Sequence, residues 1–144
     1  MTSPQATKAA QIPLKPDKTG QIHLLLVDDS SLNCLALRAY LTRRGFDVTT
    51  AQNGQEALEK FDAAVHQLIL MDLHMPVMDG YQATRLLRER GEVLPIIALT
   101  ASLPQEVENK VYAVGFSGIL NKPVDPDKFI IQINQLIRPE SWES

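Results

Sequence analysis

Leu68-Ile69-Leu70-Met71-Asp72 is a short apolar run that ends in a carboxylate. An apolar run of this length is typical of a strand buried on both faces, as strands are in parallel sheets. Three other runs have the same form: 22–27 precedes the pair Asp28-Asp29, 96–99 precedes Thr100, and 118–121 precedes Lys122. The sequence therefore places three carboxylates, a hydroxyl and an amine at the ends of predicted strands.

Stretches with helical periodicity separate these runs and complete the predicted order of elements. Ser30 or Ser31 is the expected N-cap of the first helix, and Asp79 or Gly80 is expected to open the third. Pro104 is expected in the first turn of the fourth helix, where proline is tolerated. We expect strands at about 23–27, 46–51, 67–72, 95–99 and 116–120.

Alternating strands and helices of this length predict an α/β fold, with a parallel sheet covered by helices on both faces. Right-handed crossovers bring the carboxyl ends of the strands to one edge of such a sheet. Ligands bind at that edge, where the strand order reverses. The polar residues at the strand ends should therefore converge on a single site.

The composition indicates one globular domain. The chain has 144 residues, of which 44% are hydrophobic and 22% charged, and its formal net charge is −3. This charge gives no electrostatic reason to expect nucleic-acid binding, and no apolar stretch approaches the roughly 20 residues of a membrane span. The single cysteine, Cys34, excludes an internal disulfide and favours a reducing intracellular compartment. We expect a flexible linker or tail at 1–21, the domain at 22–138 and a short C-terminal tail at 139–144.

The predicted site has the chemistry to receive a phosphoryl group. Asp28 and Asp29 face a third carboxylate, and a bound divalent cation relieves the repulsion between such groups. A few oxygen ligands suit Mg²⁺, with Mn²⁺ as an alternative ion. The ammonium of Lys122 can neutralise one phosphoryl oxygen, and Thr100 can donate a hydrogen bond to another. Asp72, alone at the end of the third strand, is the candidate nucleophile and would form an aspartyl phosphate.

Four motifs surround these residues: Leu26-Val27-Asp28-Asp29-Ser30, Met71-Asp72-Leu73-His74-Met75-Pro76-Val77-Met78-Asp79-Gly80, Ala98-Leu99-Thr100-Ala101 and Leu120-Asn121-Lys122-Pro123. Together, in this order and spacing, they resemble the receiver (response-regulator) domain of two-component signalling. The resemblance extends from about Ile22 to Ile137. It implies a flavodoxin-like (βα)5 fold, which is a doubly wound five-stranded parallel sheet of order 2-1-3-4-5.

The resemblance also implies a role for each residue of the site. The catalytic group would be Asp72 as phosphoacceptor, Lys122 and Thr100, and the metal ligands would be Asp28, Asp29, Asp72 and the main-chain carbonyl of His74. The bond between Lys122 and Pro123 would be cis. One position departs from the pattern, because Ile119 stands where many receivers carry Tyr or Phe. That departure leaves phosphorylation untouched and questions the usual aromatic readout.

The function implied is Mg²⁺-dependent phosphoryl transfer from a phosphohistidine to Asp72, followed by conformational switching. The partner would be a phosphohistidine-bearing kinase or a histidine phosphotransfer domain. The domain would catalyse its own phosphorylation and dephosphorylation without being an enzyme in its own right. It would bind neither nucleic acid nor membrane, and a weak or state-dependent dimer is compatible with the sequence.

Asn33 and Gly115-Phe116-Ser117-Gly118 look most like the C-terminal receiver of a hybrid histidine kinase. Cytoplasmic localisation is expected, with tethering to an inner-membrane sensor kinase if the full-length protein is such a hybrid. A stand-alone single-domain response regulator and a receiver-like interaction module that is never phosphorylated are the alternatives. A haloacid-dehalogenase-like phosphatase is disfavoured, because it needs a second acid two residues after its nucleophile and His74 stands there.

Overall fold

The computed structural model describes residues 16–101 and 104–137 and places five strands and five helices in strict alternation. The strands are β1 (Ile22–Val27), β2 (Phe46–Ala51), β3 (Leu68–Asp72), β4 (Ile96–Thr100) and β5 (Gly118–Asn121). The helices are α1 (Ser31–Arg43), α2 (Gly54–Lys60), α3 (Gly80–Glu89), α4 (Gln105–Val114) and α5 (Pro126–Ile137). This alternation confirms the predicted α/β class.

All five strands belong to one parallel sheet of order β2-β1-β3-β4-β5, which confirms the predicted order. The chain therefore moves outward in one direction from β1 to β2 and in the other from β3 to β5. The order reverses between β1 and β3, and the two strands pair directly from Leu24 with Leu68 to Val27 with Met71. A ligand site is expected just beyond the carboxyl ends of these two strands.

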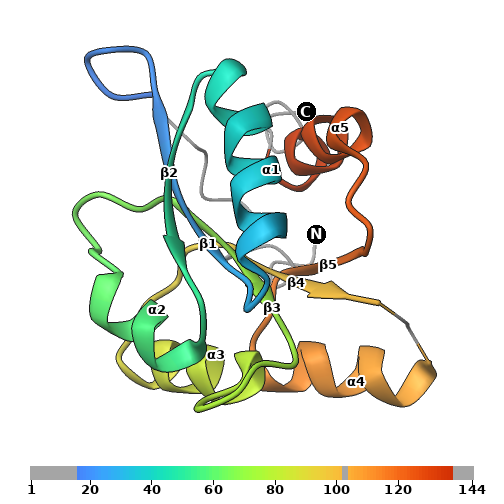
Figure 1. Ribbon diagram of the computed structural model, residues 1–144. Coiled ribbons are helices and arrows are strands. Elements are labelled where there is room, and N and C mark those ends of the chain that lie inside the picture. The colour runs from blue at the N-terminus through green and yellow to red at the C-terminus, as the bar shows by residue number, and fades with distance from the viewer. Residues whose placement is uncertain (1–15, 102–103, 138–144) are drawn as a thin grey trace, which may run out of the picture.

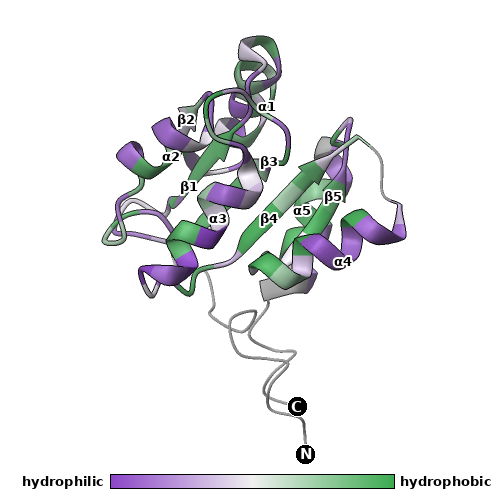
Figure 2. Ribbon diagram, turned by 90° about the horizontal axis from the view of Figure 1, so that it is seen from below, coloured by the Kyte–Doolittle hydropathy of each residue, from purple (hydrophilic) through white to green (hydrophobic). Residues whose placement is uncertain are grey.

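Two apolar cores cover the two faces of the sheet. Successive side chains of a strand point to opposite faces, so Leu24 and Leu26 belong to one core and Leu25 and Val27 to the other. Figure 1 shows α1 and α5 over one face and α2, α3 and α4 over the other. In Figure 2 the central strands are green, whereas the outer side of α4 is largely purple. The continuous apolar runs of the sequence are therefore strands buried on both sides.

The helix starts follow the capping residues of the sequence, with one exception. Ser30 is the N-cap of α1 and accepts a hydrogen bond from the amide of Asn33, and Asp79 caps α3 in the same way. Pro104, predicted in the first turn of α4, instead precedes it as the N-cap residue. The Pro104 carbonyl accepts the first backbone hydrogen bonds of α4, from the amides of Val107 and Glu108. Its own backbone is extended and not helical, so the N–H that proline lacks removes no hydrogen bond from the helix.

The last strand also begins later than predicted. Phe116 and Ser117, expected in a strand from 116, lie in the connection after α4, and β5 begins at Gly118. The amide of Phe116 donates to the carbonyl of Val111 and so serves the end of the helix. Gly115, with φ of 117°, makes this closing turn possible.

The predicted boundary at residue 22 coincides with the start of β1, but the linker character of 1–21 stays a prediction. Residues 1–15, 102–103 and 138–144 lie outside the described part of the chain. Residues 16–21 form a hydrogen-bonded turn that leads into β1. Across the described ranges, no helix is both long enough and apolar enough to cross a membrane.

Candidate functional site

The polar residues at the strand ends meet at one edge of the sheet. Asp72 and Thr100 are the last residues of β3 and β4, Asp28 follows β1 directly, and Lys122 follows β5. Asp28, Asp72 and Thr100 are buried, although polar groups of this kind usually lie at the surface. The sheet therefore presents a concentrated polar site at the edge of a largely apolar core.

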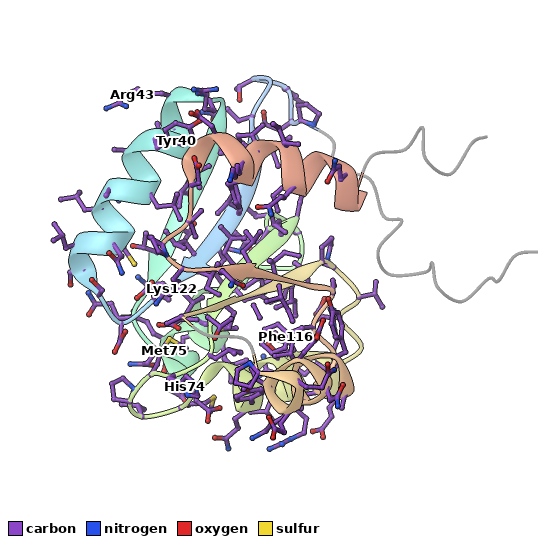
Figure 3. All side chains as sticks on the ribbon, turned by 90° about the vertical axis from the view of Figure 1, so that its right-hand side faces the viewer. Tyr40, Arg43, His74, Met75, Phe116 and Lys122 are labelled. Atoms are coloured by element: carbon purple, nitrogen blue, oxygen red, sulfur yellow. The ribbon has the colours of Figure 1, made fainter. Side chains whose placement is uncertain are left out.

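Lys122 joins the two buried carboxylates. Its Nζ lies 3.1 Å from Oδ2 of Asp72 and 3.3 Å from Oδ2 of Asp28. Figure 3 shows Lys122 above Met75 and His74, while Tyr40 and Arg43 lie at the far end of α1. One cation thus compensates two buried anions, and the site retains net negative charge.

The three aspartates can share a cation. One carboxylate oxygen from each of Asp28, Asp29 and Asp72 lies within 4.8 Å of the others, and Asp29 is exposed while the other two are buried. Hard oxygen donors that number fewer than six suit Mg²⁺, which keeps part of its water shell. The donor set therefore fits the predicted magnesium ion.

The electrostatics of the site agree with a need for further positive charge. Burial raises the pKa of Asp72, Lys122 counteracts this rise, and Asp28 and Asp29 add to it. Burial alone would lower the pKa of Lys122, but the bonds to Asp72 and Asp28 outweigh burial and raise it. Lys122 is therefore held in its charged form.

The turn between β1 and α1 fixes Asp28. Oδ1 of Asp28 accepts a 2.9 Å hydrogen bond from the amide of Ser30, and the Cys34 thiol points to the Asp28 carbonyl at 3.4 Å. Burial, together with the charge of Asp28, raises the pKa of Cys34 to about 11. Cys34 is therefore a protonated core residue and not a reactive thiol.

A second contact supports this turn from the neighbouring loop. Nε2 of Gln52, after β2, donates a 2.6 Å hydrogen bond to Oγ of Ser31 at the start of α1. The amide of Gln52 in turn donates to the carboxylate of Glu56 in α2. Sequence reasoning did not identify Gln52, because nothing in its local pattern shows that it reaches across the sheet edge.

Two glycines, Gly80 and Gly54, fix the loop between β3 and α3. A Cβ at Gly80 would collide with the carbonyl of Asp72, so α3 can start this close to the site only with glycine. The amide of Gly54, at the start of α2, donates to the carbonyl of Met78, and a Cβ there would lie 2.7 Å from that oxygen. Both glycines allow backbone contacts that hold this loop in place.

The side chain of His74 does not enter the acidic site. It is exposed, and its ring contacts the edge of Tyr81 with 6.2 Å between centroids.

Val77, at the tip of the same loop, has φ of 70°, an outlier for a β-branched residue. The Lys122–Pro123 bond is cis, as the resemblance implies. The roles assigned to Asp28, Asp29, Asp72, His74, Thr100 and Lys122 stay predictions.

A cavity of about 410 Å³ opens beside the site, between α1 and the connection from β5 to α5. Asp28 and Lys122 form its polar end, and most of its remaining wall is apolar. The buried charges are therefore approachable from solvent along this side of α1.

Comparison with known proteins gives consistent matches along nearly the whole described chain. A family model described as the response regulator receiver domain matches residues 24–134. The transcriptional regulatory protein ResD of Bacillus subtilis is 34% identical over 128 residues, covering 89% of this chain and 53% of ResD. The sensor protein EvgS of Escherichia coli K12 is 36% identical over 129 residues, covering 90% of this chain and 10% of EvgS. The chain therefore spans about half the length of the first of these relatives and a tenth of the second.

Solved structures agree with the family match. The chemotaxis protein CheY4 of Vibrio cholerae superposes with a TM-score of 0.75 at 32% identity, covering 80% of this chain and 98% of that chain. The signal receiver domain of a signal transduction histidine kinase from Syntrophus aciditrophicus gives a TM-score of 0.69 at 26% identity, covering 80% of this chain and 89% of that chain. Both free-standing proteins and modules of larger ones thus share this fold.

Proposed function

The chain belongs to the response regulator receiver family of two-component signalling, and from this premise we propose that it takes up a phosphoryl group on Asp72 from a phosphohistidine. The observation that carries the proposal is the pairing of Lys122 with both Asp28 and Asp72 at the carboxyl edge of the sheet. A buried nucleophile beside a cation and a second carboxylate is the arrangement that phosphoryl transfer to an aspartate needs.

Each residue has a distinct part in this reaction. A carboxylate oxygen of Asp72 attacks phosphorus, the bond from phosphorus to the donor nitrogen breaks, and the imidazole leaves with the electron pair. Lys122, already 3.1 Å from Asp72, can then bind a phosphoryl oxygen. Thr100, at the end of the neighbouring strand, can donate its hydroxyl to another. The transfer thus replaces a carboxylate charge at Lys122 with phosphoryl charge.

The metal ion belongs to the same proposal. Asp28, Asp29 and Asp72 would hold Mg²⁺ together with the main-chain carbonyl of His74. The bound ion would supply positive charge that offsets the charge on the phosphoryl oxygens. Mn²⁺ would suit the same oxygen donors.

Acetyl phosphate tests the proposal on the isolated chain. With Mg²⁺ present, intact-mass spectrometry should show one added phosphoryl group on the wild type, and Asp72→Asn should show none. Asp79→Asn is the matched control, because Asp79 lies in the following loop but its carboxylate caps α3. Removal of Mg²⁺ by a chelator should suppress the addition. The proposal fails if Asp72→Asn is modified to the same extent as the wild type, or if the wild type is not modified.

The context that we propose is the receiver module of a hybrid histidine kinase, with a phosphohistidine-bearing kinase or phosphotransfer domain as partner. Sequence similarity to EvgS supports it, and similarity to ResD supports the alternative of a response regulator. We further propose that the domain acts in the cytoplasm. The gene sequence upstream of Met1 tests the context, because kinase domains encoded there would establish the hybrid and a stop codon would exclude it.

A further inference from the structure

Two carboxylates contact one histidine at the end of the sheet opposite the acidic site. His23 lies in β1, with Nε2 2.7 Å from Oδ2 of Asp17 and Nδ1 2.8 Å from Oδ2 of Asp47. Asp47 is the partner of His23 in the register of β1 with β2, whereas Asp17 belongs to the turn before β1. Figure 1 shows this turn as the blue loop, at the opposite end of β1 from the start of α1.

The geometry requires a proton on each ring nitrogen. A neutral imidazole has one N–H, so it can donate to only one of two ionised carboxylates. The hydrogen bond to Asp17 has the largest effect on the pKa of His23, and together with the bond to Asp47 it raises this pKa. Burial opposes the rise with a smaller effect. Hydrogen bonds from Thr19 and His23 hold the pKa of Asp17 well below its usual range, so that carboxylate is ionised. The cluster is therefore a cation between two anions.

Asp17 is also the residue that organises the turn. Its Oδ1 accepts hydrogen bonds from the amides of Thr19 and Gln21, at 2.7 and 3.1 Å, and from the Thr19 hydroxyl at 2.6 Å. Its Oδ2 contacts His23. The same side chain thus shapes residues 17–21 and ties them to the sheet.

A further titratable neighbour is His66, which precedes β3 and whose pKa is lowered by the charge of His23. Nδ1 of His66 accepts a hydrogen bond from the amide of Asp62, and Nε2 lies 3.1 Å from Oγ1 of Thr49. An acceptor nitrogen carries no proton, so His66 is neutral in this arrangement. Burial lowers the pKa of His66, and Asp62 opposes this effect. His23 therefore has two anionic partners and a neutral histidine nearby.

We propose that His23 is a proton-dependent latch that fastens the segment preceding the sheet to β1 and β2. When the ring loses a proton, one nitrogen lone pair faces a carboxylate oxygen and that contact breaks. Asp47 is held in place by the backbone pairing of β2 with β1, whereas Asp17 lies on a short turn. The turn is therefore the part that detaches. The latch does not involve the acidic site, so the proposal does not depend on phosphoryl uptake.

Nuclear magnetic resonance of the labelled chain tests the latch. The His23 ring should titrate above the ordinary value of 6.5, with both ring nitrogens protonated at pH 6. The order parameters of the Thr19, Gly20 and Gln21 amides should fall from about 0.85 to below about 0.6 as pH rises through that titration. The latch is overturned if His23 titrates at or below 6.5, or if the turn keeps its order after His23 is neutral.

Three variants separate the latch from a merely local effect of pH. His23→Gln should leave the turn mobile at every pH, and Asp17→Asn should loosen it and lower the pKa of His23. Asp47→Asn should lower the same pKa while the turn stays attached at low pH, because the Asp17 contact remains. Glu106→Gln, which removes an exposed carboxylate from α4, should change neither readout. A turn that is equally ordered in His23→Gln and wild type would contradict the latch.

Discussion

Lys122 compensates two buried anions at one end of the sheet, and this makes it a competitor of any cation that binds there. Its Nζ contacts the Oδ2 atoms of both Asp28 and Asp72, which are also the candidate metal ligands. The ammonium and a divalent ion therefore draw on the same carboxylate charge. Lys122 thus offsets part of the negative charge that a bound divalent ion would offset.

Replacement of Lys122 by methionine should consequently tighten Mg²⁺ binding. Methionine keeps much of the side-chain volume and removes a positive charge that lies within 3.3 Å of Asp28 and Asp72. We expect the Mg²⁺ dissociation constant to fall about tenfold, since charges at this distance interact by at least 1 kcal/mol even in water. Isothermal titration calorimetry measures it, with Lys110→Met on α4 as the control of equal charge. Unchanged or weaker binding in Lys122→Met would contradict the competition.

The buried hydroxyl of Thr84 should lower the stability of the fold. Thr84 of α3 is fully buried, and its Oγ1 has no hydrogen-bond partner within the described part of the chain. An unsatisfied buried hydroxyl costs free energy that valine, with nearly the same shape, would not. Thr84→Val should therefore raise the free energy of unfolding by about 1 kcal/mol in urea denaturation. Thr84→Ser, which keeps the hydroxyl and loses a methyl group, should instead lower it.

The position of the polar residues at the strand ends was the part of the site most readily predicted from sequence. Asp28, Asp72, Thr100 and Lys122 each follow an apolar run, and parallel strands leave their ends little freedom to diverge. The requirement for glycine at position 80 was harder to predict. Any side chain there would collide with the carbonyl of Asp72, which lies on the other side of the loop. Such contacts between elements have no local sequence signal.

At the scale of elements, Arg88 links three segments at the other end of the sheet. Its Nε donates to the carbonyl of Gly115 at 2.9 Å, and Nη1 donates to the carbonyls of Glu92 and Leu94. Nη2 donates to Oγ of Ser117, which in turn accepts from the amide at the start of β4. The guanidinium thus ties the end of α3 to the connections before β4 and β5.

Arg88→Leu should destabilise the fold by about 2–4 kcal/mol, because it leaves several partly buried carbonyls without donors. Arg88→Lys should recover only part of the loss, since one ammonium cannot reproduce the planar fork of donors. Arg85→Leu, on an exposed position of the same helix, should change the free energy of unfolding by no more than about 0.5 kcal/mol. Urea denaturation followed by circular dichroism measures all three. Equal losses for Arg88→Leu and Arg85→Leu would refute the role of Arg88.

Element boundaries followed the sequence where a cap or a breaker marks them. Ser30 and Asp79 begin their helices because their side chains bond to the first free amides. The start of β5 was wrong, because Phe116 looks like a strand residue but its amide completes the end of α4. Phe116 contacts Tyr81 of α3 instead, edge to face at 6.3 Å between centroids. Apolar character alone could not decide which neighbour it joins.

At the scale of the whole molecule, the sheet separates two regions of charge. The acidic site lies at the carboxyl ends of the strands, and His23 with Asp17 and Asp47 lies at the opposite end. Ile119, at the position where the resemblance implied an aromatic readout, packs against the core that contains Tyr81 and Phe116. Changes at the acidic site can therefore reach α4 through this apolar packing, which is a property of the assembled fold.

His66 and His23 should change the free energy of unfolding with pH in opposite directions. Burial lowers the pKa of His66 in the folded state, so below pH 6.5 this histidine is protonated more fully in the unfolded chain than in the folded chain. His66 therefore contributes stability that is lost as pH falls from 6.5 toward its folded pKa. The pKa of His23 is raised by its carboxylates, so its contribution is complete below 6.5 and is lost as pH rises through the folded pKa.

Stability should consequently pass through a maximum near the ordinary histidine pKa, with one histidine responsible for each side. His66→Gln should flatten the decline of the unfolding free energy between pH 6.5 and 5, and His23→Gln should flatten the decline above pH 6.5. Urea denaturation at half-unit steps of pH measures both slopes. His74→Gln is the control, because the His74 ring is exposed and has no carboxylate partner among the described residues. If His66→Gln removed the alkaline slope, or His23→Gln the acid slope, the two environments would be wrongly assigned.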